Sequence, residues 1–226
     1  MSIHNTNKKA RRHALGLAAQ IDPSKQQRFS SKPQPFFVSM FRNCGDRDAR
    51  FVCALRHKLM LIGCNHVTNC EAEQLSQRLC VAARTLPPRC MYAAVRTIMN
   101  AWCTAARFGG DKDCVFCGAI SCDRIQHVRQ CPAVCDALYA SLASPFSLPE
   151  VLSFNHFFLL GCTNPSRMLR GIIILDILCR AYTAARHRTA RPDAKWIWDT
   201  INARLRTLAI HSADVRILIG EYFRIA

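Results

Sequence analysis

Four cysteines and one histidine gather in the segment CVFCGAISCDRIQHVRQCP, which covers residues 114–132. The segment opens with a C-x2-C pair, Cys114 and Cys117, and ends with an H-x3-C pair, His127 and Cys131. Three thiolates and one imidazole form a closed tetrahedral set, which suits a structural Zn2+ ion and leaves no position open for a reactive water. The types and spacing of these residues therefore predict a structural zinc site rather than a catalytic one.

The residues between the two pairs indicate how the ligands are positioned. Gly118 directly follows the C-x2-C pair and favours a tight turn, in which backbone N–H groups face the thiolates. His127 and Cys131 are four residues apart, so on a helix they share one face. Asp123 stands near the start of that helix, where an acid is favoured, and it could accept a hydrogen bond from the His127 ring.

Alternatives to this ligand set remain open. The chain has 14 cysteines, so metal-like spacings also arise by chance among small core residues. Cys122 could replace His127, because four thiolates also suit zinc. Cys135 is expected in the core, one helical turn beyond the site. A second group could bind another metal, but its irregular spacing and apolar surroundings favour buried thiols and hydrogen-bonded histidines. That group consists of Cys53, His57, Cys64, His66 and Cys70.

The chain is strongly basic, with 31 Lys and Arg residues, 15 Asp and Glu residues and a formal net charge of +16. Such an excess favours a polyanionic partner, most simply RNA or DNA, because each phosphate contact releases a condensed counterion. A solubilising surface or a basic tail is the plainer interpretation. No stretch reaches the ~20 apolar residues that span a bilayer, so no membrane association is expected.

The first part of the chain indicates the cellular compartment and a disordered N-terminal tail. It lacks the apolar region of a secretory signal, so we expect reduced thiols and an intracellular protein, nuclear or cytoplasmic rather than mitochondrial. Residues 1–36 are rich in polar residues and are expected to form a disordered basic tail. Within it, KKARRHALGLAAQ (residues 8–20) has three interpretations: a basic arm, a nuclear address or a mitochondrial presequence.

Beyond this tail the apolar periodicity is helical, with no alternating strand pattern and no repeat. We expect helices over residues 49–63, 71–86, 88–108, 133–142, 151–160, 166–187, 194–208 and 214–223. An apolar stripe along the third of them comprises Met91, Val95, Ile98, Met99 and Trp102. The expected fold is mainly α: an irregular helical bundle with a small CCHC zinc knuckle inserted between helices.

The segment LPPRCMYAAVRTIMNAWCTAARF (residues 86–108), followed by the cysteine segment, resembles a known pairing. It is similar to the region just C-terminal to the polymerase of non-LTR retrotransposon reverse transcriptases, where a basic R-T-x-x-N-x-W-x-T-x-x-R helix leads into a C-x2-C … D-x3-H-x3-C segment. The matching positions are Arg96, Thr97, Asn100, Trp102, Thr104 and Arg107, then Cys114, Cys117, Asp123, His127 and Cys131. The resemblance covers about residues 86–135, and LCRAYTAARHR (residues 178–188) is similar to the helix that follows in such elements.

The resemblance implies a helical thumb and linker, a zinc knuckle, and contacts with template RNA or target DNA. It divides the chain into the tail, a thumb/linker-like region at 37–110, a zinc knuckle at 111–135 and a C-terminal helical region at 136–226. The residues expected to contact nucleic acid are Arg89, Arg96, Asn100, Arg107, Arg124 and Arg129; the alternative is ordinary helix surface. The chain has no Asp-Asp pair and no strand signal, so we expect no polymerase activity.

Other functional classes remain open. The C-terminal helices could dock on a protein partner, which would make the chain an interaction module with structural zinc. A restriction-type nuclease would need two acids and a lysine around a divalent cation, and Asp176, Asp193 and Lys195 offer that count. Its acids would need a strand context, however, and Asp176 falls in an expected helix. We therefore predict no catalytic residues; oligomeric state is not indicated, and a retroelement fragment without a selected role is a further possibility.

Overall fold

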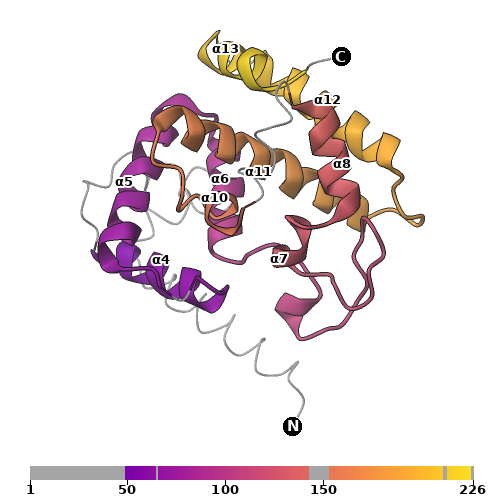
Figure 1. The fold of residues 1–226 in the computed structure, drawn as a ribbon, viewed down its shortest axis with the longest axis horizontal. Helices are drawn as coiled ribbons and strands as arrows, with labels where there is room; N and C mark the ends of the chain where they lie inside the picture. Colours follow the sequence, from indigo (N-terminus) through magenta and orange to yellow (C-terminus); the bar gives the residue numbers. More distant parts are fainter. Residues whose placement is uncertain (1–48, 65, 143–152, 211–212, 225–226) are drawn as a thin grey trace, which may run out of the picture. The chain divides into compact units, whose positions relative to one another are not determined.

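The computed structural model describes residues 49–64, 66–142, 153–210 and 213–224 (Figure 1). The chain divides after Phe37 into two units, and all of these residues belong to the second. The expected tail, residues 1–36, lies outside the described part of the chain. Within that part the fold is mainly α and contains no strand, which confirms the predicted fold class. An isolated β-bridge joins Leu142 to Phe223.

The long helix α11 (Pro165–Arg186) is the centre of the helical unit. It packs against α5 (Asn69–Thr85), α6 (Pro88–Ile98), α10 (Phe154–Phe157), α12 (Ala194–Ala209) and α13 (Ala213–Tyr222). Every residue from 172 to 179 is buried, so this stretch of the helix is enclosed on all sides. The side chain of Asn164 caps its first turn by accepting a hydrogen bond from the Ser166 N–H at 2.8 Å.

The N-terminal side of the unit consists of α4 (Ala49–Leu61), α5 and α6. α4 packs against α5 and α6, and α5 and α6 both contact α11. A capping box starts α5: the Glu71 N–H donates to the Thr68 hydroxyl at 3.2 Å, and the Thr68 N–H donates to the Glu71 carboxylate at 2.8 Å. The expected helices over 49–63 and 71–86 are therefore found within a few residues of their predicted bounds.

On the C-terminal side, α12 packs against α8 (Pro132–Ser141), α11 and α13. A buried ion pair joins α11 to α12: the Arg204 Nε lies 2.6 Å from the Asp176 carboxylate. Arg180, one turn along α11, lies 3.4 Å from the other oxygen of the same carboxylate. Because Asp176 and Arg204 are both buried, this pair fixes how the two helices meet.

The expected helix over residues 88–108 is wrong beyond Ile98, where α6 ends. The Ala101 N–H donates to the Arg96 carbonyl at 2.6 Å, and the Asn100 N–H donates to the Thr97 carbonyl at 3.0 Å. Asn100 has a left-handed φ of 49°, so these bonds form a Schellman motif with Asn in place of the usual Gly. The chain then turns back, and the short 3-10 helix η1 (Ala106–Phe108) follows.

The apolar stripe expected in this segment is nevertheless largely buried. Met91, Val95 and Ile98 enter the core from α6, while Met99 is half-buried at the helix end. Trp102 is fully buried although it lies beyond the helix, because its ring N–H donates to the Thr97 hydroxyl at 3.0 Å. The turn at Asn100 thus folds the tryptophan back onto the helix that precedes it.

Two further segments differ from the expected pattern. Of the helix expected over 151–160, the described residues contain only α10 (Phe154–Phe157), and residues 143–152 lie outside the description. The short helix α7 (Ile125–Val128) lies between the cysteine segment and α8. No helix in the described ranges is both long enough and apolar enough to cross a membrane.

Candidate metal centre

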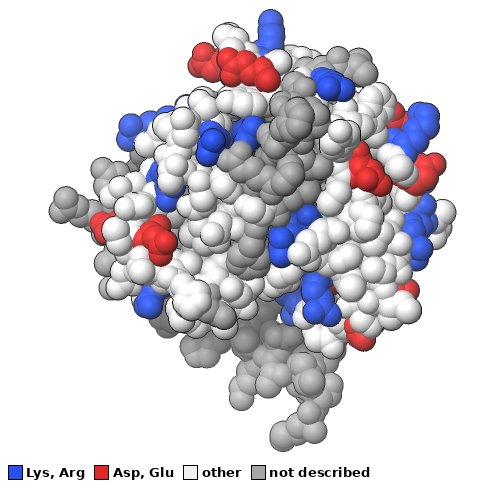
Figure 2. All heavy atoms as spheres, in the orientation of Figure 1, with Lys and Arg blue, Asp and Glu red and all other residues white. Residues whose placement is uncertain are grey.

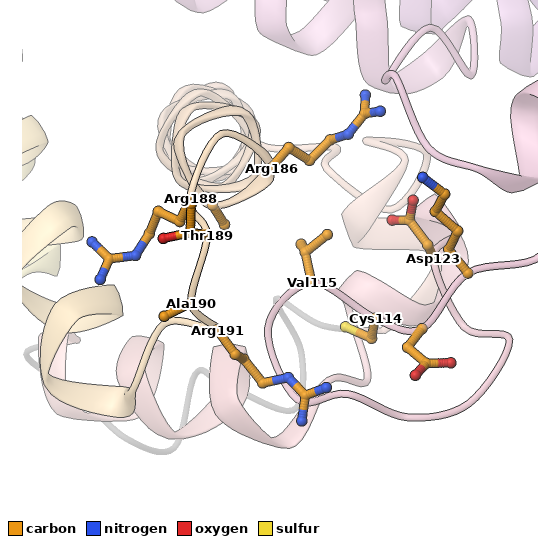
Figure 3. Close-up of a pocket in the computed structure, with 11 residues that line it drawn as sticks. Cys114, Val115, Asp123, Arg186, Arg188, Thr189, Ala190 and Arg191 are labelled. Carbon is orange, nitrogen blue, oxygen red and sulfur yellow. The ribbon is translucent and has the colours of Figure 1, made fainter.

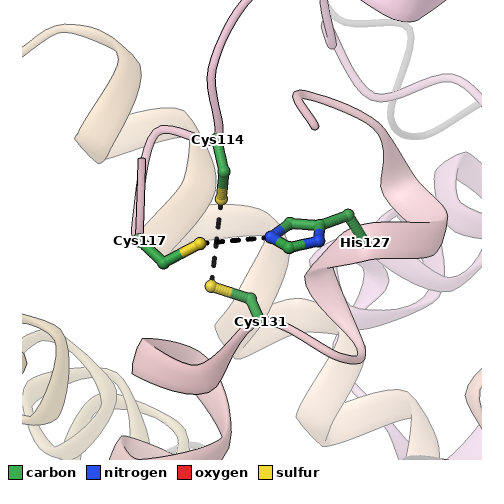
Figure 4. A group of neighbouring side chains, drawn as sticks. All are labelled: Cys114, Cys117, His127 and Cys131. Carbon is green, nitrogen blue, oxygen red and sulfur yellow. Dashed lines mark hydrogen bonds between the residues drawn. The ribbon is translucent and has the colours of Figure 1, made fainter. Parts of the chain in front are cut away.

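The ligand atoms of Cys114, Cys117, His127 and Cys131 all lie within 4.8 Å of one another. The Cys114 and Cys131 sulfurs are 3.8 Å apart, and the Cys117 sulfur is 3.2 Å from the His127 Nε2. These two contacts cross in Figure 4, where the four side chains point toward a common centre. The four residues chosen from their spacing are therefore brought together, and they could hold a metal ion.

The dimensions of this cluster fit a tetrahedral ion. A tetrahedral metal with metal–sulfur bonds of about 2.3 Å holds its sulfurs about 3.8 Å apart. The Cys114–Cys131 distance of 3.8 Å matches this edge. Cys114 and Cys131 are buried, and Cys117 and His127 are half-buried, so the four ligand atoms are partly shielded from solvent.

The backbone around Cys114 explains how two thiols three residues apart reach the same centre. The Gly118 N–H donates to the Cys114 carbonyl at 2.9 Å, and the Cys114 N–H donates to the Ala119 carbonyl at 2.9 Å. These bonds close a tight turn that requires a left-handed residue, and Gly118 supplies it with a φ of 75°. The expected turn at Gly118 is therefore confirmed.

The helix expected to carry both His127 and Cys131 is wrong. His127 lies on α7, which ends at Val128, whereas Cys131 is the N-cap residue of α8. Pro132 occupies the first position of α8 and disfavours a helical conformation at the residue before it, so Cys131 is extended with a ψ of 118°. The two ligands thus converge through a turn between two helices and do not share one helical face.

Electrostatics in the cluster favour one ionised thiol. The pKa of Cys114 is lowered, because its sulfur shares a hydrogen bond with Cys131 and accepts backbone N–H groups of Cys117 and Phe116. The same shared hydrogen bond, together with burial, raises the pKa of Cys131. A cation bound between the sulfurs would replace this shared proton and hold both as thiolates.

Asp123 has a different role from the one expected. Its carboxylate does not contact the His127 ring: one oxygen accepts the Ala105 N–H at 2.7 Å and the other accepts the Tyr182 hydroxyl at 2.7 Å. Burial and this bond to Asp123 raise the pKa of Tyr182. Since Tyr182 lies on α11, the aspartate ties the metal-binding segment to the central helix.

The alternative ligand sets are not assembled within the described residues. Cys122 does not join the four-residue cluster, so His127 is the fourth donor. The group formed by Cys53, His57, Cys64, His66 and Cys70 likewise gives no set of three neighbouring donors in the described ranges. Cys135 is half-buried on α8, where burial raises its pKa, and its thiol lies 3.7 Å from the Arg129 carbonyl.

Two of the residues expected to contact nucleic acid converge on one backbone oxygen. The Ala101 carbonyl accepts from the Arg96 Nε at 3.1 Å, the Arg96 Nη2 at 2.9 Å and the Arg107 Nη1 at 3.0 Å. Each guanidinium also lies over a ring, Arg96 over Tyr92 and Arg107 over Phe108. No carboxylate among the described residues pairs with either arginine. We call this pair the arginine clamp.

The other four residues expected to contact nucleic acid differ in how exposed they are. Arg124 is exposed and donates to the Ser121 carbonyl at 2.8 Å, and Asn100 is half-buried at the turn after α6. Arg129 is half-buried near the start of α8. Arg89 faces the interior, where its Nε and Nη2 are buried without a hydrogen-bond partner, and burial lowers its pKa, as do Arg204 and Arg180. Figure 2 shows basic and acidic side chains interspersed on one face rather than one continuous basic patch.

A pocket of about 280 Å3 separates the metal-binding segment from the end of α11, a feature without a sequence signal. It is lined by Cys114 and Asp123 on one side and by Arg186 and Arg191 on the other. Figure 3 shows Arg191 reaching toward the loop that carries Cys114, whereas Arg188 points away. A Cβ at Gly118 would overlap the Arg191 guanidinium, so the glycine also allows this arginine to approach the turn.

The residues considered for a nuclease have structural roles. Asp176 is buried in the ion pair with Arg204, and Asp193 caps α12 by accepting the Trp196 N–H at 2.7 Å. Lys195 pairs with Asp199 at 2.8 Å on the surface of α12. These three residues do not form a metal-binding group in the described part of the chain.

Comparisons with protein-family models, with curated proteins and with solved structures give no match to this chain. The site must therefore be interpreted from its own geometry.

Proposed function

We propose that this chain is a zinc-stabilised helical module that binds nucleic acid. Its role would correspond to that of the region following the polymerase in non-LTR retrotransposon reverse transcriptases, which residues 86–135 resemble, without polymerase activity of its own. The observation that carries the proposal is the arginine clamp, in which Arg96 and Arg107 share one neutral acceptor. A phosphate would supply the negative charge that the described residues around them do not.

Zinc is the metal that the donor set favours. Tetrahedral sites rich in thiolate select zinc or iron–sulfur chemistry, and a fourth imidazole ligand is common in structural zinc sites. Three sulfurs and one nitrogen would fill all four positions, so the ion would supply folding free energy and no open coordination site. The proposal therefore assigns Cys114, Cys117, His127 and Cys131 a structural role.

The clamp is positioned by the turn at Asn100, which lies between its two arginines in the sequence. The Schellman motif at Asn100 directs the Ala101 carbonyl toward the side chain of Arg96 on α6. Arg107, on η1, reaches the same oxygen from the other side of the turn. Hydrogen bonds that hold guanidinium groups before a ligand arrives reduce the entropy lost on binding, which supports a role in recognition.

The proposal is tested by salt-dependent binding of the full, zinc-loaded chain to labelled RNA and DNA oligonucleotides. Binding should weaken as salt rises, with the logarithm of affinity falling linearly against the logarithm of salt concentration. The double substitution Arg107→Gln/Arg124→Gln should lower affinity for every sequence and reduce that slope by about 2. Anisotropy titrations at four or more salt concentrations give both quantities.

Arg216→Gln is the matched control for this experiment. Arg216 is also exposed and also donates to a backbone carbonyl, that of Ala209, at 3.2 Å. It lies on α13, away in sequence from the clamp, so its loss should leave the slope unchanged. Absence of binding to every oligonucleotide, or binding that does not respond to salt, would refute the proposal.

A protein-interaction module is the second candidate, supported by exposed isoleucines at the C-terminal end. Ile210 is 80% exposed at the end of α12, and Ile217 is 61% exposed on α13. Large exposed apolar side chains on the last two helices of the described chain offer surface for contact with a partner. Such binding would persist at high salt and would be weakened by Ile217→Asp, whereas the arginine substitutions would leave it unchanged.

A further inference from the structure

A pocket of about 420 Å3 opens beside the arginine clamp. Arg107 and Arg124 contribute charge to its lining, and Asn100 and Gln126 contribute amide groups. Thr104 and Ile125 also line it, but each is only 1% exposed. Residues from the end of α6, from η1 and from the start of α7 thus meet around one space, although no periodic pattern in the sequence joins them.

The lining of this pocket suits a flat heterocycle that has hydrogen-bonding edges. Asn and Gln side chains each present a donor and an acceptor, the combination that reads the edge of a nucleobase. The plane of an arginine guanidinium offers a surface on which the face of a base can stack. The volume lies within the range of pockets that enclose small organic ligands. A single unpaired base would fit this volume, whereas a base paired within a duplex is held in the stack and is not free to enter.

An exposed aromatic ring lies next to the pocket. Phe108 is 68% exposed, and the Arg107 guanidinium lies 5.3 Å from its ring centre. Arg107 both lines the pocket and contacts this ring, so it links the pocket to Phe108, which is not itself a lining residue. An exposed phenylalanine beside fixed guanidinium groups has the composition of a stacking platform for successive bases of a single strand.

We infer that this site binds single-stranded nucleic acid, with one unpaired base in the pocket and a neighbouring base on Phe108. Arg96, Arg107 and Arg124 would contact the phosphates that connect the bases. The inference rests on the proposed function and narrows its ligand to strands with unpaired bases. In a duplex the bases are stacked and paired, so only the phosphate contacts would remain.

The test compares single-stranded RNA, single-stranded DNA and a duplex of the same sequence, each titrated into the full, zinc-loaded chain. Phe108→Ala should weaken binding of the single strands by roughly 5- to 150-fold, the loss expected for one stacked base. Binding of the duplex should change less than about twofold, since its phosphate contacts are intact. Phe108→Trp should restore single-strand binding, because any flat ring can stack.

Ile210→Ala is the control, since Ile210 is also a largely exposed apolar residue and lies at the C-terminal end of α12, outside the pocket lining. It should leave every affinity unchanged. Equal affinity for the duplex and the single strands, or single-strand binding that is unaffected by Phe108→Ala, would overturn this inference while leaving the proposed function standing. Failure of all three nucleic acids to bind would instead overturn the proposed function.

Discussion

At the scale of single residues, the position of a cysteine side chain decides whether it belongs to the candidate metal centre. Cys114 and Cys131 meet in the interior at a distance of 3.8 Å, whereas Cys122 belongs to no group of neighbouring donors in the described ranges. His127 faces Cys117, which makes an imidazole the fourth donor. Cysteine content alone therefore says little about metal binding; convergence of the side chains decides it.

This difference predicts opposite outcomes for two cysteine substitutions. Cys131→Ser should lower zinc affinity by more than about 100-fold, because it removes a ligand rather than one of the outer contacts that tune a site. Cys122→Ser should leave one zinc bound per chain. Metal analysis and competition with a chromogenic chelator measure both variants. Loss of zinc from the Cys122 variant, with retention in the Cys131 variant, would show that the ligand set is wrong.

At the scale of elements, the helices meet through one buried carboxylate and an excess of guanidinium groups. Asp176 on α11 pairs with Arg204 on α12 and with Arg180, and Arg89 on α6 lies near enough for Arg204 to lower its pKa. The carboxylate thus holds together positive charges contributed by three helices. Asp176, Asp193 and Lys195 offered the two acids and the lysine that a metal-dependent nuclease needs. In the fold, however, Asp176 pairs with Arg204 and has a structural role.

Removing this carboxylate should destabilise the helical unit strongly. Asp176→Ala leaves Arg204 buried without its partner, which costs about 3–5 kcal/mol in the free energy of unfolding. Asp199→Ala removes the exposed pair with Lys195, which water screens, and should lower the free energy of unfolding far less. Urea denaturation followed by circular dichroism compares the two variants. Equal losses would contradict the central role assigned to the buried pair.

At the scale of the whole helical unit, the metal-binding segment is part of the main core. Phe116, Ile125 and Val128 are buried in the same hydrophobic cluster as the residues of α6 and α11. The Tyr182 ring lies 5.3 Å from Trp102 and 6.2 Å from Phe116, so one aromatic group contacts both the segment and the turn after α6. The segment is therefore expected to unfold together with the helices.

Metal removal should therefore lower the thermal stability of the entire helical unit. Chelation should lower the melting temperature by roughly 10–20 °C in one cooperative transition, as expected for a loss of about 5 kcal/mol. Tryptophan fluorescence, to which the buried Trp102 contributes, should change in the same transition. Re-addition of Zn2+ should restore the original melting curve. A chelated protein that keeps its melting temperature would contradict a structural role for the ion.

The sequence by itself determined the helical class, the approximate bounds of most described helices and the four residues of the metal cluster. These follow from local information: a 3.6-residue apolar period, prolines and glycines at helix ends, and ligand spacing along the chain. The turn at Gly118 was predictable for the same reason, since a tight loop after a C-x2-C pair needs a residue that accepts positive φ.

Only the tertiary structure decided how distant residues are used. It ended α6 at a left-handed Asn100, where folding Trp102 into the core outweighs the helical propensity of the following residues. It turned Asp123 from a possible partner of His127 into an acceptor for Tyr182, 59 residues away. It also brought Arg96 and Arg107 to one carbonyl beside a pocket. Each of these depends on how the segment packs against the rest of the fold, which local periodicity does not encode.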